Sequence, residues 1–221
     1  MAKQLAIKID IVSDTVCPWC FIGKRRLENA MNQFRATHPD VTFSIEWHPY
    51  QLSPDMARHE GRSVREHYAR KFGEERMRSM IPYMQDIGKQ EGIKFTYNGL
   101  VSNTVDSHRL AFWAKQFGRQ TEVVEEMFKD YFSNDKNIGD YQVLASAAER
   151  AGLDKNKALE YLNSEADVDT IRKEASSWPA QGITGVPHFI IEGKYNFPGA
   201  QEPETFTAFF EKALANKKNS L

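Results

Sequence analysis

Residues 11–26, IVSDTVCPWCFIGKRR, decide the fold. A run rich in β-branched residues ends in this stretch, and a helical pattern begins at Pro18. Both cysteines of the chain, Cys17 and Cys20, lie at this junction with only Pro18 and Trp19 between them. A bridge across C-x-x-C closes almost no loop, so the pair is a poor structural staple. The pattern indicates redox or metal chemistry.

The residues around the two thiols predict different roles for them. Proline suits the first position of a helix, which makes Cys17 the N-cap. There the free backbone N–H groups and the positive end of the helix dipole favour the thiolate. Cys20 follows one turn later, on the face that points toward the core. We therefore expect an exposed Cys17 that attacks a disulfide and a shielded Cys20 that resolves the mixed disulfide, with Trp19 exposed and in contact with the substrate.

The flanking segments predict a β-α-β unit. Residues 5–13, LAIKIDIVS, are typical of a buried strand, and residues 41–52, VTFSIEWHPYQL, predict a second strand that ends at prolines. Between them, apolar side chains recur at helical spacing. This stripe comprises Cys20, Gly23, Leu27, Met31 and Phe34.

The middle of the chain predicts a helical block over residues 55–178, with loops marked by glycines. Asn103 and Asp140 are candidate N-caps of two of its helices. Strands return at residues 186–200, where two short apolar runs flank Glu192-Gly193, a hairpin signal. An amphipathic helix then closes the chain. The expected parts are 1–54, the insertion 55–178 and the C-terminal part 179–221.

Composition and charge exclude several classes of protein. A chain of 221 residues with 41% hydrophobic residues can bury a core. A formal net charge of −1 leaves no electrostatic footprint for nucleic acid or an anionic membrane. No apolar run approaches the roughly 18 residues of a membrane span. The first residues, MAKQLAIKIDIV, predict a strand rather than a secretory leader, so we expect a cytoplasmic protein.

A metal site is the main alternative for the cysteine pair. Zinc needs four ligands, and the chain has neither a second C-x-x-C nor a closely spaced histidine pair. An iron–sulfur cluster would need ligands from outside the chain, because each chain supplies two thiolates. We therefore expect no metal. Two buried cysteines without a chemical role are the remaining alternative.

A second motif, QGITGVPHFII at residues 181–191, precedes the late strands. Proline cannot donate to a strand ladder, so Pro187 belongs at a strand start or edge. The Val186-Pro187 bond is a candidate for the cis isomer.

Together these motifs resemble the DsbA-like thioredoxin-fold family, in particular its FrnE-type branch, which is related to 2-hydroxychromene-2-carboxylate isomerase and the kappa-class glutathione transferases. The similarity runs from about Ile9 to Phe210. The matching stretches are SDTVCPWCFIGKRRLE, IEWHPYQLSP, EGIKFTYNGLVSNTVDSHRLAFWA, NIGDYQVLASAAERAGLD, GITGVPHFII and FPGAQ.

The resemblance implies an α/β protein with a thioredoxin fold (β-α-β, then β-β-α) interrupted by a large all-helical insertion. It implies protein dithiol–disulfide oxidoreductase activity on protein or peptide substrates, with Cys17 as nucleophile and Cys20 as resolving thiol. The redox-active Cys17–Cys20 disulfide replaces a cofactor, and glutathione is a candidate reductant and partner.

Further site residues follow from the same resemblance. It implies that Pro187 is a cis-proline facing the dithiol and that Val186 offers backbone groups to an extended substrate. The insertion would overhang the site and present Asn103 and His108 toward it. The candidate substrate-binding residues are therefore Pro18, Trp19, Val186, Pro187, Asn103 and His108.

Two positions depart from the family pattern. Thioredoxins and DsbA carry an acid six residues before the first cysteine, where this chain has Ile11. Asp10 and Asp14 flank that position, which leaves the proton acceptor for Cys20 open. His188 follows the proline, where a hydroxyl or an aromatic residue is expected, and either tunes Cys17 or packs in the core.

Other polar and apolar groups have alternative interpretations. His48 is expected in a capping or surface role or, alternatively, near the active-site face. Residues 24–26, KRR, are expected on a solvated helix face or, alternatively, bias Cys17 toward the thiolate. Met77, Met80 and Met84 recur at helical spacing, which indicates core packing or, alternatively, an adaptable peptide groove.

Three functions are compatible with the sequence. The first is a thiol–disulfide oxidoreductase or isomerase of protein disulfides. The second is a glutathione-dependent transferase or isomerase, although those relatives carry serine where this chain has Cys17. The third is a non-catalytic, chaperone-like binder, whose function would survive the loss of both thiols.

Overall fold

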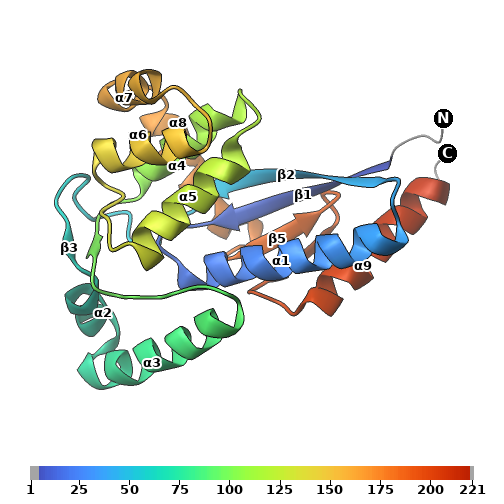
Figure 1. Ribbon diagram of the computed structural model, residues 1–221, viewed down its shortest axis with the longest axis horizontal. Coiled ribbons are helices and arrows are strands. Elements are labelled where there is room, and N and C mark those ends of the chain that lie inside the picture. The colour runs from blue at the N-terminus through green and yellow to red at the C-terminus, as the bar shows by residue number, and fades with distance from the viewer. Residues whose placement is uncertain (1–4, 220–221) are drawn as a thin grey trace.

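A four-stranded sheet organises the protein in this computed structural model, which describes residues 5–219 (Figure 1). Its strand order is β2-β1-β5-β6, and β1 runs parallel to β2 and antiparallel to β5. The predicted β-α-β and β-β-α units are confirmed. Their elements are β1 (Leu5–Ser13), α1 (Pro18–Thr37), β2 (Val41–Pro49), β5 (His188–Ile191), β6 (Tyr195–Pro198) and α9 (Pro203–Asn219).

The late hairpin forms where the sequence predicts it. Glu192 and Gly193 both have positive φ, 55° and 64°, which suits the tight turn between two antiparallel strands. β5 and β6 pair from His188 opposite Pro198 to Ile191 opposite Tyr195. The hairpin therefore places the start of β5, directly after Pro187, beside the end of β1.

Seven α-helices separate the two halves of the sheet within the described chain: α2 (Val64–Phe72), α3 (Glu74–Gln90), α4 (Val105–Lys115), α5 (Gln120–Ser133), α6 (Tyr141–Arg150), α7 (Lys155–Asn163) and α8 (Val168–Ser177). A 3-10 turn, η1 (Trp178–Gln181), follows them. The expectation of an all-helical insertion is wrong in one detail, because β3 (Arg62–Ser63) and β4 (Leu100–Val101) form a two-stranded ribbon. Runs of two residues carry no periodicity that a sequence pattern could reveal.

Two predicted helix starts can be compared with the structure. Asp140 caps α6, and its carboxylate accepts a hydrogen bond from the Gln142 N–H at 2.7 Å. Asn103 is not the N-cap of α4, which is Thr104. The Asn103 side chain still accepts from the Val105 N–H at 2.9 Å, so it serves the helix start from one residue further out.

The insertion is held together by a buried arginine. Arg109 on α4 is fully buried and pairs with Asp106 at 2.7 Å. Its guanidinium also donates to carbonyl oxygens at the end of α7, those of Tyr161, Ser164 and Ala166. A buried charge needs such partners, so these bonds fix α4 against α7.

The insertion also packs against α1. Phe21 on α1 stacks with Phe128 on α5, with ring centroids 5.0 Å apart. Lys24 and Arg25 both pair with Glu125 of α5, at 2.7 and 2.5 Å. Burial alone would raise the pKa of Glu125, but these two cations outweigh it and lower the pKa to about 2. The expected solvated face for residues 24–26 is therefore wrong, because the insertion supplies carboxylates that the local sequence does not show.

Figure 1 shows α4–α8 gathered beyond the arrowheads of β1 and β2, while α2 and α3 lie on the other side of the start of α1. Within residues 5–219, no helix combines the length and apolarity needed to cross a membrane.

Candidate active site

A cavity of about 660 Å³ opens between the start of α1, the α2–α3 pair and the end of α5. We call it the dithiol cavity, because Cys17 lies on its wall. Most of its lining is aromatic or apolar. Its lining residues from the start of α1 are Cys17, Pro18 and Trp19, and those with aromatic rings elsewhere include Tyr68, Phe72, Tyr83, Tyr97 and Tyr131.

Cys17 is the N-cap of α1, with extended backbone angles (φ −91°, ψ 115°) and proline next to it, as predicted. Its N–H donates to the Asp14 carbonyl at 3.1 Å, which closes the turn between β1 and α1. The expectation of an exposed Cys17 is wrong, since only 4% of the residue is accessible. The insertion covers the helix tip, and Cys17 is left on the wall of the dithiol cavity.

Cys20 lies one turn further along α1 and is 1% exposed, so the expected shielding is confirmed. Burial and the neighbouring Cys17 sulfur raise the pKa of Cys20 well above its ordinary value, while the Ser13 side chain and the Asp14 backbone act in the opposite direction. Burial therefore favours the neutral thiol form of Cys20 over the thiolate.

The loop that contains Val186 and Pro187 lies beside Cys17. The Val186-Pro187 peptide bond is cis. The Cys17 thiol donates to the Val186 carbonyl oxygen at 3.6 Å, although 169 positions separate the two in sequence. Pro187 packs against Gly23, where an added Cβ would lie 3.2 Å from the proline Cγ. Glycine at this position therefore allows the close approach of α1 to the proline loop.

Trp19 differs from its expected state. It is half-buried and packs against the hydrophobic core instead of standing free at the helix tip. Its ring still contributes to the wall of the dithiol cavity, and so does Pro18.

Asn103 and His108 do not line the dithiol cavity. The Asn103 amide donates to the carbonyls of Pro54 and Met56 at 2.8 and 2.9 Å, so it fixes the loop after β2. The His108 imidazole lies 2.9 Å from the Tyr50 carbonyl oxygen. Both side chains contact the loop after β2. That loop lines the cavity, so the two side chains lie behind the cavity wall.

Of the two acids that flank Ile11, Asp14 is the one beside the dithiol. It is fully buried, and its Oδ2 accepts from the Leu52 N–H at 2.7 Å. Its Oδ1 lies 3.3 Å from Nε2 of His108. Asp10 faces away from this loop and pairs with Lys8 and His48. Of the two acids, Asp14 is therefore the one bonded to the loop that lines the dithiol cavity.

Three tyrosines that the sequence interpretation did not single out complete the wall near Cys17. Tyr68 comes from α2, Tyr131 from α5, and Tyr97 from the segment before β4. Burial first, and then the charge of Cys17, raise the pKa of Tyr97. The Tyr-Asn-Gly sequence at 97–99 is a turn signal, whereas Tyr131 lies on an ordinary apolar helix stripe. Neither pattern reveals that the two side chains line one cavity.

The rim of the dithiol cavity is basic. Lys71 and Arg76 line it, and among the described residues no carboxylate lies within ion-pair distance of either. Burial and the charges of Lys71 and Arg62 lower the pKa of His67, another lining residue. Three exposed apolar side chains stand beside these cations: Leu52, Phe72 and Tyr83. The rim thus combines positive charge with apolar contact surface.

Met80 and Met84 also line the dithiol cavity, and Met77 packs against the core nearby. Core packing is confirmed for Met84, which is only 2% exposed and still lines the cavity, whereas the adaptable peptide groove stays a prediction. His188 is buried and outside the cavity lining, and burial lowers the pKa of its imidazole.

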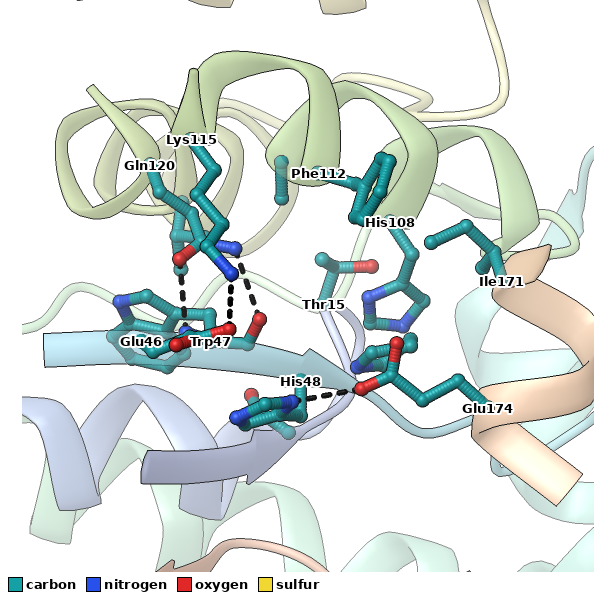
Figure 2. Close-up of a pocket in the computed structure, with 14 residues that line it drawn as sticks. Thr15, Glu46, Trp47, His48, His108, Phe112, Lys115, Gln120, Ile171 and Glu174 are labelled. Carbon is teal, nitrogen blue, oxygen red and sulfur yellow. Dashed lines mark hydrogen bonds and ion pairs between the residues drawn. The ribbon is translucent and has the colours of Figure 1, made fainter. Parts of the chain in front are cut away.

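A second cavity, of about 40 Å³, lies on the other side of the loop after β1 (Figure 2). We call it the polar cavity. Figure 2 shows Lys115 reaching Glu46, Gln120 reaching the Trp47 backbone, and His48 reaching Glu174. His48 is thus neither a cap nor a free surface group.

Glu46 and His48 of the polar cavity belong, with Asp10 outside its lining, to the one set of side chains in residues 5–219 with metal-like spacing. Asp10, Glu46 and His48 place ligand atoms within 4.8 Å of one another. Lys8 already pairs with Asp10 at 3.1 Å, and Lys115 pairs with Glu46. A metal ion would have to displace both lysines, so the geometry favours an internal ion-pair network.

Comparison with known proteins agrees with this architecture. Residues 8–211 match the family model of the DSBA-like thioredoxin domain. The uncharacterized protein YwbO of Bacillus subtilis is 27% identical over 221 residues, covering 97% of this chain and 98% of its own.

Solved structures give the same result. A probable DsbA oxidoreductase from Streptomyces coelicolor superposes with a TM-score of 0.84 at 27% identity, covering 95% of this chain and 90% of its own. The cytosolic disulfide reductase DsbM from Pseudomonas aeruginosa, also solved with GSH, has a TM-score of 0.65 at 15% identity over 94% of this chain and 98% of its own. The DsbM likeness concerns the fold.

Proposed function

The chain belongs to the DsbA-like thioredoxin domain family, and we propose that it is a thiol–disulfide oxidoreductase that reduces or isomerises protein disulfides through Cys17 and Cys20. Members of this family are oxidoreductases or isomerases, which supports an enzymatic role. The specific substrate class and the roles of the two cysteines are our inference.

One observation carries the proposal. The Cys17 sulfur lies at the positive end of α1, beside the Val186 carbonyl, and on the wall of a cavity large enough for a peptide segment. Cys20 is held one turn below, where a substrate cannot reach it first. This asymmetry is what a dithiol exchange reaction needs.

The reaction proceeds in two exchanges. The Cys17 thiolate attacks one sulfur of the client disulfide, forming a mixed disulfide and releasing the other client sulfur as a thiolate. Cys20 then loses its proton and attacks the Cys17 sulfur, which releases the second client thiolate. The two client thiolates take up one proton that Cys20 released and one from water, so the client gains two electrons and the enzyme is left with a Cys17–Cys20 disulfide.

A low-molecular-weight thiol restores the dithiol, and we propose glutathione for this step. Two molecules of the thiol supply the two electrons and leave as their disulfide. The structure of DsbM with GSH, and the cytosolic reductase activity in its name, support this choice and a reducing, cytoplasmic setting for the reaction. There the resting enzyme is the dithiol.

Insulin-disulfide reduction and refolding of a scrambled disulfide protein, each with a glutathione supply, test the proposal. We expect activity in at least one assay and its loss in Cys17→Ser. Inactivity in both, together with conjugation of glutathione to an electrophile, would assign the protein to the transferase class. Suppression of client aggregation that survives Cys17→Ser with Cys20→Ser, without exchange activity, would assign it to the chaperone-like binders.

A further inference from the structure

Two buried hydroxyl groups in the dithiol cavity have no hydrogen-bond partner among the described residues: those of Tyr97 and Tyr131. The two residues are 5% and 4% exposed, so their hydroxyls are also shielded from bulk water. A buried hydroxyl without a partner is costly, and in native proteins it usually indicates an ordered water or ion beside it, or a functional role. Both residues line the same cavity as Cys17.

The position of Tyr97 is built by its neighbours. Its φ of 57° lies in the left-handed region, which residues with a Cβ rarely adopt. The Thr96 N–H donates to the Phe132 carbonyl at 3.0 Å, and the Thr96 hydroxyl bonds to Asp135. These contacts tie the segment before β4 to the end of α5, next to Tyr131. The two rings are therefore held on one wall by backbone bonds.

Asp14 and Cys17 are the candidate acceptors. Cys17 lines the same cavity as both tyrosines, whereas Asp14 does not. The Asp14 oxygens already face the Leu52 N–H and the His108 ring. Neither hydroxyl bonds to the Cys17 sulfur while this sulfur, as a thiol, donates to the Val186 carbonyl, so the acceptor that we consider is the ionised Cys17. After the larger effect of burial, the charges of Asp14, Tyr97 and Cys17 raise the pKa of Tyr131.

The Cys17 sulfur needs donors only when it is ionised. As a thiol it donates to the Val186 carbonyl at 3.6 Å. As a thiolate it can only accept, and the Val186 oxygen then repels it. The nearby Cys20 N–H is already bonded to the Cys17 carbonyl at 3.0 Å. Burial keeps both tyrosines neutral, so they remain donors at physiological pH.

We propose that the Tyr97 and Tyr131 hydroxyls are hydrogen-bond donors to the Cys17 thiolate and thereby set the redox poise of the Cys17–Cys20 pair. This inference rests on the proposed function. Hydrogen bonds to the thiolate stabilise the reduced enzyme and leave the disulfide form unaffected, so they make the couple more oxidising. They also favour the thiolate form of Cys17, which is the nucleophile.

The reduction potential of Tyr97→Phe, Tyr131→Phe and the double variant, measured against glutathione redox buffers at neutral pH, tests the inference. Each substitution removes only a hydroxyl oxygen. We expect each to shift the dithiol–disulfide equilibrium about tenfold toward the disulfide, which is about 30 mV more negative for a two-electron couple. Thiolate absorbance of the reduced protein near 240 nm should fall in parallel.

Tyr161→Phe is the matched control. It removes a hydroxyl that donates to Asp167 at 2.9 Å, far from the dithiol on α7. It should lower stability without moving the potential. Unchanged potential and thiolate absorbance in both cavity variants would overturn the inference.

The outcome also separates this inference from the proposed function. If the wild-type cysteines form no reversible disulfide in the redox buffers, the proposed function fails with it. If they form one and its reduction potential is unchanged in both Phe variants, only the tyrosine inference fails. Should a Phe variant fold poorly, the other single variant still measures one hydroxyl alone.

Discussion

The two cavities beside the end of β1 differ in how their polar groups are bonded. In the polar cavity, lysine, glutamate, histidine and glutamine side chains pair with one another or with the backbone (Figure 2). In the dithiol cavity, the two tyrosine hydroxyls lack a hydrogen-bond partner among residues 5–219, and Lys71 and Arg76 lack a carboxylate partner, although Lys71 donates to the Leu52 carbonyl. Bonding capacity that the fold does not use is available to a ligand or to an ionised Cys17. We infer that the polar cavity stabilises the fold and that the dithiol cavity is the functional site.

The difference also shows that a cluster of titratable side chains is not by itself a functional site. The group of Asp10, Glu46 and His48 has the spacing of a metal site, yet Lys8 and Lys115 satisfy its charges. The dithiol cavity contains no carboxylate in its described lining and is mostly apolar. An apolar cavity with a few polar groups that lack partners is a better indication of a binding site than a cluster of charges that are already paired.

The largest expected effects concern the dithiol cavity. Cys17→Ser should lower disulfide reduction by about a thousandfold or more, because the nucleophile is lost. Cys20→Ser should instead accumulate mixed disulfides with client proteins, because the resolving step is lost. Non-reducing gels of protein incubated with a disulfide-containing client measure both. Equal trapping by the two variants would show that Cys20 is not shielded.

The second prediction concerns Asp14, which connects the two cavities. It accepts from Leu52 on the wall of the dithiol cavity and faces His108 on the wall of the polar cavity. Because burial raises the pKa of Cys20, the resolving step needs a proton acceptor, and we expect Asp14 to supply it.

Asp14→Asn should slow resolution of a preformed mixed disulfide on the order of tenfold to a hundredfold, as measured by stopped-flow thiol release. Asp10→Asn is the control, because Asp10 is a similarly buried acid on β1 that pairs with His48. Similar rates for both variants and the wild type would leave another group as the acceptor.

Local chemistry made much of the fold predictable. Proline after Cys17 fixes a helix start, and Glu192-Gly193 fixes a hairpin, because each depends on a few adjacent residues. The contact between Val186 and Cys17 was predicted from the resemblance to a known family, because no local sequence pattern indicates it.

The errors share a physical cause, which is burial by distant segments. Cys17 and Trp19 sit at a helix tip, a position that is exposed unless another element covers it, and here the insertion does. Tyr97 and Tyr131 line one cavity because the segment before β4 is tied to the end of α5. Such contacts depend on tertiary packing, so they were absent from the sequence interpretation.

The third prediction concerns Lys71 and Arg76, the two rim cations that have no carboxylate partner among the described residues. We expect faster reduction of a peptide disulfide flanked by aspartates than of the same peptide flanked by lysines, by about tenfold in kcat/KM. The double variant Lys71→Glu with Arg76→Glu should reverse this preference. Lys94→Glu is the control, since Lys94 is exposed and outside the cavity lining. An unchanged preference in the double variant would mean that the rim does not select charge.

The smallest expected effect lies in the polar cavity and concerns stability. Burial alone lowers the pKa of His48, but hydrogen bonds with Glu174 and Asp10 outweigh it, so the pKa is raised. A raised folded-state pKa stabilises the protein fully below the unfolded value of about 6.5, and the contribution disappears as the pH rises through the folded value.

Glu174→Gln should therefore cost about 1 kcal/mol of unfolding free energy at pH 6 and less at pH 9, as measured by urea unfolding. Disulfide reduction should stay unchanged, because Glu174 does not line the dithiol cavity. Glu160→Gln on α7 is the control, since Glu160 is exposed and has no ion-pair partner in the described chain. A loss that is larger at pH 9, or a drop in activity, would mean that the paired groups of the polar cavity do more than stabilise the fold.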